Sequence, residues 1–210
     1  MNMKLSTTAA CAVMGLAATT GHAIELTTNG GFETGTFAGW TQFPTGAGQQ
    51  TITNVNPASG IFAGEINNGV AASNSLIKQA NIGIGIVTAG QTIQISFDAR
   101  GSYAQPGGVA FAEFFSEIAG GGTSKSEILG GAPLNINADP NAWKHFTFTT
   151  TAGPIVSGGV TLQLGAVNGA AAGGTHMFFD NASVSVVPEP ATMAVLGMGA
   201  LALLRRKRTS

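Results

Sequence analysis

Few side chains in this sequence have the type and spacing for acid–base or nucleophilic chemistry. After residue 24 the histidines are His145 and His176, and neither stands in an HxH or HExxH spacing that would bind a metal ion. No GxSxG segment marks a nucleophile, and no Gly-Lys-Ser or Gly-Lys-Thr triplet marks a phosphate-binding loop. Glu113 and Glu117 are four residues apart in a strand-like segment, where both would be solvated. We therefore predict no catalytic residue and do not expect an enzyme.

Asp180 is the carboxylate with the most demanding position. Strict period-2 counting along the last strand-like segment puts it on the same face as Ala182 and Val184, which should be the core side. An ionised carboxylate buried there is costly unless it is paired or bound to a cation. Either a β-bulge turns Asp180 outward or a metal ion neutralises it.

Short segments rich in β-branched and aromatic residues must position these side chains. In residues 92–100, the apolar Ile93, Ile95 and Phe97 alternate with polar residues, which is the pattern of a half-buried strand. Similar segments are residues 50–55, 109–118, 144–150 and 160–166. The glycine clusters between them mark turns. No stretch of the body sustains an apolar period of 3.6, so we predict an all-β domain of two antiparallel sheets packed face to face.

The body of the chain, residues 24–186, is acidic. It contains four Lys and Arg against nine Asp and Glu, a net charge of −5 that the basic C-terminus hides. Such a body lacks the basic patch of a nucleic-acid-binding protein. The single cysteine, Cys11, precedes the body, which therefore has neither a disulfide nor a reactive thiolate.

The first 23 residues have the features of a secretory signal peptide. Lys4 is followed by a short apolar stretch, and small residues around His22 predict cleavage after Ala23. A buried N-terminal helix is the alternative, but the threonines of this segment are poor helix formers. We predict an exported protein in three parts: a helical signal peptide at 1–23, a domain at 24–186 and a C-terminal segment at 187–210.

The C-terminal segment has the features of a short membrane anchor. Residues 191–204 are an uncharged apolar run, and as a helix they would span about 21 Å, which basic side chains at the end can extend by snorkelling. The prolines before the run prevent an earlier helix start. The terminal cations should stay on the cytoplasmic side; a last buried helix would leave them unexplained. These cations are Arg205, Arg206, Lys207 and Arg208.

The tripeptide Pro188-Glu189-Pro190, the apolar run and the basic end together resemble the PEP-CTERM sorting signal of Gram-negative bacteria. This resemblance implies that an exosortase, an integral-membrane peptidase-like enzyme, recognises the tripeptide and removes the tail. The protein would be anchored in the inner membrane during sorting and would then reach the cell surface or the extracellular space. The prolines would keep the recognised segment extended and accessible.

Several motifs of the body match one known fold: Asn29-Gly30-Gly31-Phe32-Glu33 with Trp40, the strand at 92–100, Trp143 with Phe146 and Phe148, and Phe178-Phe179-Asp180-Asn181. With these motifs the body resembles jelly-roll carbohydrate-binding modules of the galactose-binding-like fold. The resemblance places both tryptophans in the core. Tyr103, in the loop 101–108, then remains as the exposed aromatic residue that could contact a sugar.

The same resemblance implies a structural calcium ion. Its ligands would be the carbonyl of Gly31 and the carboxylates of Glu33 and Asp180, with Glu65 as a further candidate, and such hard oxygen ligands suit Ca²⁺. A solvated or hydrogen-bonded carboxylate pair without a metal is the alternative.

We expect a non-catalytic, exported protein of the cell surface or the extracellular matrix, associated with the exopolysaccharide of a biofilm. A lectin-like carbohydrate-binding module is the alternative, and a surface polysaccharide hydrolase is the third reading. The expected partners are the exosortase, the inner membrane during sorting and exopolysaccharide.

Overall fold

The computed structural model describes residues 22–103, 107–169 and 174–187, and every regular element in these ranges is a β-strand. The alternating segment at 92–100 lies in β6 (Thr92–Tyr103), where Ile93, Ile95 and Phe97 are completely buried. The other predicted segments correspond to β3 (Gln49–Thr53), β7 (Gly108–Glu117), β9 (Lys144–Thr151) and β10 (Val160–Asn168). The helices predicted for the signal peptide and the anchor lie outside the described residues. Within these ranges no helix is long and apolar enough to cross a membrane.

Two antiparallel sheets face each other, which confirms the predicted β-sandwich. The six-stranded sheet has the order β3-β4-β11-β6-β9, and β1 pairs with the end of β11. Its further strands are β1 (Ile24–Glu25), β4 (Ala63–Asn68) and β11 (Thr175–Val186). The five-stranded sheet has the order β2-β5-β10-β7-β8. Its further strands are β2 (Thr41–Thr45), β5 (Ser73–Ile82) and β8 (Thr123–Ile128).

The hydrophobic core lies between the two sheets and is rich in aromatic rings. Phe97 stacks on Phe146 with 5.3 Å between the ring centroids. Phe32 and Trp40, from the segment that precedes β2, stack with a centroid distance of 5.3 Å and are both buried. Trp40 is therefore a core residue, as the motif comparison predicts.

Polar side chains fill part of the same interior. Asn68 of β4, Ser73 and Ser75 of β5 and Thr175 of β11 are each 1% exposed or less. Asn68 donates its side-chain N–H to the carbonyl of Ala166 across the sandwich, at 2.6 Å. The two sheets are thus joined by hydrogen bonds as well as by apolar packing.

A bulge in β11 resolves the position of Asp180. The pairing of β11 with β6 shifts between Asp180 and Ser183, and Asn181 has a positive φ of 49°. Phe179 and Ala182 consequently both belong to the hydrophobic core. Asp180 instead pairs across the ladder with Asp98, so the bulge turns it away from the hydrophobic core to the outer side of the sheet, as one of the two predicted solutions required.

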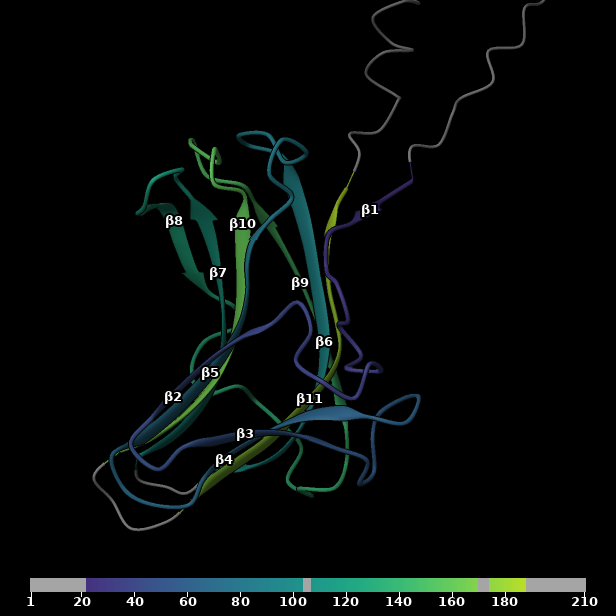
Figure 1. The fold of residues 1–210 in the computed structure, drawn as a ribbon, viewed down its shortest axis with the longest axis vertical. Helices are drawn as coiled ribbons and strands as arrows, with labels where there is room; N and C mark the ends of the chain where they lie inside the picture. The colour runs from purple at the N-terminus through teal and green to yellow at the C-terminus, as the bar shows by residue number, and fades with distance from the viewer. Residues whose placement is uncertain (1–21, 104–106, 170–173, 188–210) are drawn as a thin grey trace, which may run out of the picture. The chain divides into compact units, whose positions relative to one another are not determined.

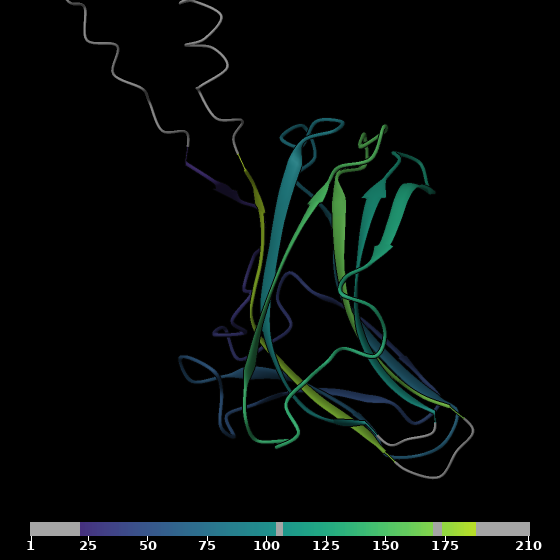
Figure 2. The ribbon, with the colours of Figure 1, turned by 180° about the vertical axis from the view of Figure 1, so that it is seen from behind.

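The strands of the five-stranded sheet bend along their length, so that the outer face of this sheet is concave (Figures 1 and 2). The short strand β1 lies beside the end of β11, where Ile24 pairs with Val186 and Glu25 with Ser185. The first and last described residues therefore leave the sandwich close together.

Candidate functional site

The glycine-rich segment 29–33 closes onto the bulge of β11. The Ala182 N–H donates to the Gly30 carbonyl at 3.0 Å, and a Cβ on Gly30 would lie only 1.8 Å from the Ala182 carbonyl oxygen. A Cβ on Gly31 would lie 3.6 Å from Asp180 Oδ1. Glycine at residue 30 lets the backbone approach β11 closely, and the segment brings Glu33 toward Asp180.

The Asp180 carboxylate is completely buried and is held by backbone N–H groups. Its Oδ2 accepts from the N–H groups of Ala58 and Ser59 at 2.9 and 3.1 Å, and its Oδ1 accepts from Asn181 N at 2.7 Å. Burial raises the pKa of Asp180; the three N–H groups oppose this shift, and the charge of Glu33 adds to it. The site therefore contains a negative charge that no cationic side chain neutralises among its hydrogen-bond partners.

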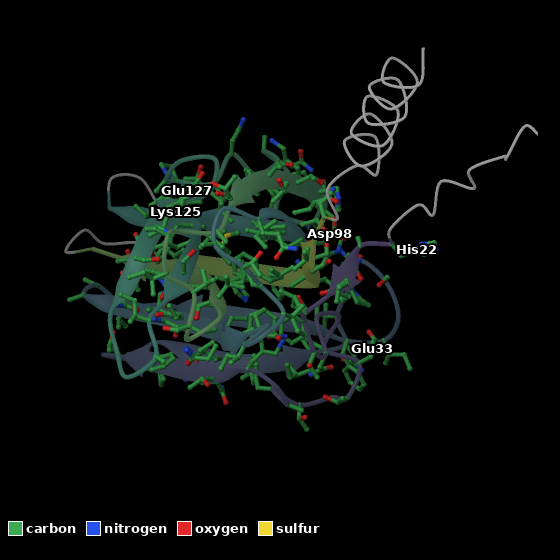
Figure 3. All side chains as sticks on the ribbon, turned by 90° about the horizontal axis from the view of Figure 1, so that it is seen from above. His22, Glu33, Asp98, Lys125 and Glu127 are labelled. Carbon is green, nitrogen blue, oxygen red and sulfur yellow. The ribbon has the colours of Figure 1, made fainter. Side chains whose placement is uncertain are left out.

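Glu33 binds the loop 54–62, which also contains Ala58 and Ser59, the residues that bind Asp180. Its carboxylate accepts from the Ile61 and Phe62 N–H groups at 3.0 to 3.1 Å. A Cβ on Gly60 would lie 2.3 Å from Glu33 Oε1, so the loop can approach this carboxylate only with glycine at residue 60. Figure 3 marks Glu33 at the surface, in contrast to the buried Asp180.

The structure thus brings together the three residues predicted to bind calcium. Glu33 and Asp180 both accept hydrogen bonds from the loop 54–62, and Gly31 lies beside Asp180. Two carboxylates and a backbone carbonyl are the hard oxygen donors that Ca²⁺ prefers, so the predicted ligands fit such an ion in type. In this structure the oxygens of both carboxylates accept backbone N–H groups. Among the described residues, no three His, Cys, Asp or Glu side chains lie close enough together to bind a metal ion. Glu65 lies elsewhere and is bound to His176.

Both histidines of the body are paired with carboxylates, which the sequence did not reveal. His145 Nδ1 lies 2.8 Å from Asp98 Oδ1, and His176 Nε2 lies 2.7 Å from Glu65 Oε1. The first pair follows from strand register, because Asp98 and His145 are directly opposite in β6 and β9. Sequence spacing alone contains no such signal.

An aromatic cage surrounds Arg100 on the outer side of the six-stranded sheet. The guanidinium carbon lies 3.6 Å from the Phe178 ring centroid and 5.1 Å from that of Trp143. Its N–H groups donate to the carbonyls of Val55 and Asn56. Burial lowers the pKa of Arg100, and the charge of Glu65 opposes this shift. Trp143 is only partly buried, and its indole N–H donates to the Asn56 carbonyl at 2.9 Å, so this ring covers the sheet instead of entering the core.

The outer face of the five-stranded sheet combines apolar side chains with polar groups. In one row across the strands, Leu76 and Phe111 flank Gly165, and a Cβ on Gly165 would lie 2.5 Å from Leu76 Cδ2 and 2.7 Å from Phe111 Cζ. Phe43 extends this row on β2 and is 43% exposed. The glycine lets the two large side chains meet over the middle of the sheet.

The neighbouring row on this outer face is polar and fixed by hydrogen bonds. Gln163 lies between Lys78 and Glu113 in the ladder. Glu113 accepts from Gln163 Nε2 at 3.2 Å and from Ser126 Oγ at 2.9 Å. Lys78 Nζ lies 5.1 Å from the Phe43 ring centroid and 5.5 Å from that of Phe115. The face thus offers apolar surface, a cation and oriented hydrogen-bonding groups side by side.

Tyr103 is not on that face. It ends β6, packs against the hydrophobic core and donates its hydroxyl to the Leu134 carbonyl at 3.2 Å. The ring predicted to be the exposed sugar platform is thus partly buried. The concave face instead presents Phe43, Phe111 and Phe115, aromatic residues without a polar group.

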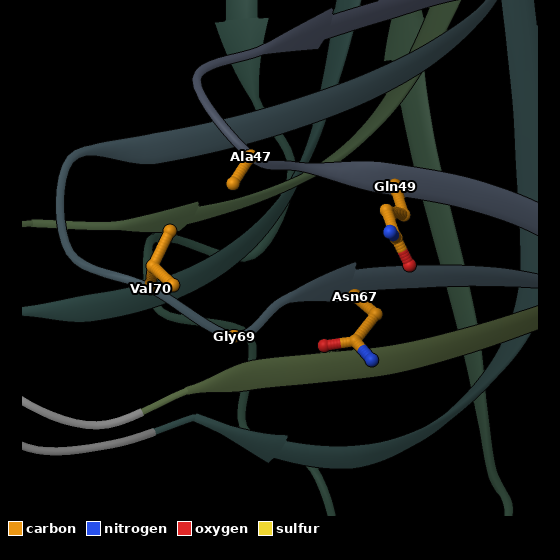
Figure 4. Close-up of a pocket in the computed structure, with 5 residues that line it drawn as sticks. All are labelled: Ala47, Gln49, Asn67, Gly69 and Val70. Carbon is orange, nitrogen blue, oxygen red and sulfur yellow. The ribbon is translucent and has the colours of Figure 1, made fainter.

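A shallow pocket lies between the turns that join β2 to β3 and β4 to β5 (Figure 4). Its volume is about 250 Å³, below the ~300–1,000 Å³ of most small-molecule sites. Ala47, Gln49, Asn67, Gly69 and Val70 line it without a charged group. We therefore assign it no function.

The residues predicted for sorting lie outside the described part of the chain. They are Pro188, Glu189, Pro190, Arg205, Arg206, Lys207 and Arg208. Ala23, the predicted signal cleavage position, is described and lies exposed directly before β1.

Comparisons with known proteins agree with the C-terminal sorting motif and with the β-sandwich fold of the body. Residues 186–208 match the model of the PEP-CTERM protein-sorting motif. No curated protein matches the chain. The CBM22-1 xylan-binding domain of Xyn10C from Paenibacillus barcinonensis is structurally similar, with a TM-score of 0.51, 15% identity, and coverage of 82% of this chain and 99% of that one.

Two further solved structures are similar. TmCBM61, solved in complex with β-1,4-galactotriose, has a TM-score of 0.50 and 18% identity, with coverage of 77% of this chain and 97% of that one. The enzymatically active domain of tailspike protein 4 from Bacteriophage CBA120 has a TM-score of 0.58 and 14% identity over 78% of this chain, which spans only 22% of the tailspike chain. The body therefore has a β-sandwich fold that carbohydrate-binding modules share, and the chain ends in a PEP-CTERM protein-sorting motif.

Proposed function

We propose that this is an exported, non-catalytic protein that binds a polysaccharide on the outer face of its five-stranded sheet. Its tail directs sorting by an exosortase to the cell surface or the extracellular matrix, where exopolysaccharide would be its ligand. The match of residues 186–208 to the sorting motif supports the sorting by an exosortase. The fold shared with carbohydrate-binding modules supports the binding of a polysaccharide.

The observation that carries the binding proposal is the composition of the concave face. Sugar rings have an apolar side that packs on flat or aliphatic surface, and hydroxyls that need oriented partners. The row of Phe43, Leu76 and Phe111 supplies the first, and Lys78 and Glu113 supply the second, with the buried Gln163 orienting Glu113. A concave face with such rows suits an extended polysaccharide chain more than a single small molecule.

The arrangement of carboxylates on the concave face supports a non-catalytic role for that face. Glycoside hydrolysis commonly uses two carboxylates about 5–10 Å apart. On β7 the outward residues Glu113 and Glu117 are four positions apart, which separates their Cα atoms by about 13 Å. Both oxygens of Glu113 already accept hydrogen bonds from Ser126 and Gln163.

Affinity electrophoresis of the mature protein in gels that contain xylan, β-1,4-galactan or extracted exopolysaccharide tests the binding face. At least one polysaccharide should retard the protein, and Phe43→Ala should weaken this binding about tenfold, because an exposed apolar contact is lost. Ile61→Ala removes an exposed apolar side chain from the loop 54–62 and should leave binding unchanged. Equal binding by both variants would place the site elsewhere, and no retardation in any gel would contradict carbohydrate binding.

The sorting step has its own test. Mass spectrometry of the extracellular fraction should find a chain that begins at Ile24 and lacks residues 205–210. Replacement of Pro188, Glu189 and Pro190 by alanine should leave the protein in the inner membrane. If that variant reaches the outside of the cell at normal size, the tail does not direct sorting.

We also propose that Glu33, Asp180 and the Gly31 carbonyl hold a structural calcium ion, which would neutralise the buried charge of Asp180. Calcium should then raise the melting temperature of the chelator-treated protein, because a ligand that binds only the folded state stabilises it. Asp180→Asn should remove this response. A melt that calcium and chelator leave unchanged in the native protein supports the alternative, a carboxylate pair satisfied by backbone N–H groups.

A further inference from the structure

Three loops meet at the end of the sandwich from which the described chain leaves (Figures 1 and 2). They are residues 83–91 between β5 and β6, 118–122 between β7 and β8, and 152–159 between β9 and β10. Gly90 N donates to the Ala152 carbonyl at 3.1 Å, and Ala119 N donates to Ser157 Oγ at 3.0 Å. The loops therefore form one connected surface, which we name the loop end.

Isoleucine side chains are exposed on the loop end. Ile84, Ile86 and Ile155 are 59%, 47% and 49% exposed. A Cβ on Gly159 would lie 3.0 Å from Ile84 Cγ1, so the loops 83–91 and 152–159 are adjacent. Ile24, opposite Val186 in the β1–β11 ladder, is 48% exposed at the same end.

The loop end is also free of charge. None of residues 83–91, 118–122 and 152–159 is Asp, Glu, Lys, Arg or His. A surface with exposed aliphatic side chains and no ionised group can enter the interfacial region of a bilayer without desolvating a charge. Charged residues border the loop end on β7 and β8: a Cβ on Gly158 would lie 3.0 Å from Glu117 Cβ, and one on Gly153 would lie 2.9 Å from Lys125 Cβ.

The course of the chain keeps this surface near any membrane that holds the tail. Val187 N donates to the Thr92 carbonyl at 3.0 Å, and Thr92 directly follows the loop 83–91. The apolar run of the tail starts at Ala191, and four extended residues span at most about 14 Å. An anchor that starts there leaves little room between the loop end and the lipid.

We propose that the loop end lies on the lipid surface while the tail anchors the protein, with Ile84, Ile86 and Ile155 in the interfacial region. The partner is the outer leaflet of the inner membrane. This inference rests on the anchoring tail of the proposed function and adds to it a fixed orientation of the domain. The anchored domain then has two attachments to the membrane, one by its tail and one by its loops.

The absence of cysteine from the mature chain allows a direct test. An environment-sensitive fluorophore is attached to Ile86→Cys, Ile155→Cys or the control Ile61→Cys in protein that lacks the signal peptide and retains the tail. Each is reconstituted into vesicles of phosphatidylethanolamine and phosphatidylglycerol, some with a quencher at the level of the headgroups. Ile61 is 62% exposed and belongs to the loop between β3 and β4, away from the loop end (Figure 1).

The expected result is a blue shift and quenching at residues 86 and 155, with neither at residue 61, in protein that floats with the vesicles. Floating protein whose probes at 86 and 155 stay water-like overturns the loop contact and leaves the anchor standing. Protein that does not float overturns both. Equal quenching at residue 61 overturns the orientation. A shift at residue 86 that grows with protein concentration without vesicles assigns the surface to a second copy of the chain and overturns the lipid contact.

Discussion

At the scale of single residues, Gly30 is where the contact between residues 29–33 and β11 is tightest. The space that its Cβ would need is occupied by the Ala182 carbonyl, at 1.8 Å. We expect Gly30→Ala to lower the free energy of unfolding by about 2 kcal/mol or more, because the segment must move away from the bulge. Chemical denaturation measures this. Gly69→Ala is the matched control, since the nearest atom to its Cβ is 3.8 Å away, and it should be nearly neutral.

If Gly30→Ala unfolds like the native protein, the segment 29–33 is not packed on β11 as described. If Gly30→Ala and Gly69→Ala change the free energy of unfolding equally, the change reflects only the general effect of replacing a glycine. The comparison therefore separates close packing from backbone propensity.

At the scale of elements, a polar bridge joins the edge strands of the two sheets. Lys125 of β8 donates to Thr150 Oγ1 of β9 at 2.6 Å and pairs with Glu127 at 2.9 Å (Figure 3). The hydrogen bond from Thr150, followed by the one from Lys125, lowers the pKa of Glu127 below its usual 4.5. The charged form of Glu127 therefore stabilises the folded protein.

This bridge predicts a specific dependence of stability on pH. The contribution of Glu127 is complete above pH 4.5 and is lost as the pH falls through the lowered pKa. At neutral pH we expect Glu127→Gln to lower the free energy of unfolding by less than about 1 kcal/mol, since the Glu127 side chain is 40% exposed. The difference from the native protein should vanish in acid, and urea unfolding at several pH values measures it. Glu117→Gln serves as the control, and a loss independent of pH would contradict the bridge.

The strands that sequence analysis predicted are those with one apolar and one polar face. β6 shows this alternation, and so do β9 and β10. β5 was missed because Ser73, Ser75 and Gln79 are on its buried face, so that no apolar period exists to detect. β4 was missed for the same reason, because Asn68 is buried beside Ile66.

The candidate site was predictable where side chains define it and not where the backbone does. Glu33 and Asp180 were named from motifs, and a bulge was one of two solutions for Asp180. The N–H groups of Ala58, Ser59 and Ile61 that bind these carboxylates have no sequence signature, because every residue except proline carries one. The concave face was missed because its residues come from four strands whose neighbours cannot be read from the sequence.

At the scale of the whole molecule, the interior is unusual in its buried oxygen atoms. Asn68 Oδ1 and Ser75 Oγ both face the space beside Gly48, where a Cβ would lie 2.6 and 2.7 Å from them. Neither atom has a hydrogen-bond partner among the described residues. A buried hydroxyl without a partner costs about 1–3 kcal/mol.

We therefore expect Ser75→Ala to leave the stability unchanged or to raise it by about 1 kcal/mol. Differential scanning calorimetry measures the change. A clear loss of stability would show that the hydroxyl is satisfied, for example by a buried water molecule shared with Asn68. Either result defines how the polar part of the interior is stabilised.

The place of β11 in its sheet has a consequence for the order of events during export. β11 is the last strand to be synthesised, yet it lies between β4 and β6 and also pairs with β1. A chain that emerges N-terminus first cannot complete the six-stranded sheet until residues 175–186 have crossed. In the export that we propose, the apolar run follows only a few residues later, so β11 would pair with its neighbours next to the translocation channel. Completion of the sheet would then pull on the last stretch of polypeptide at the moment when the proposed anchor halts it.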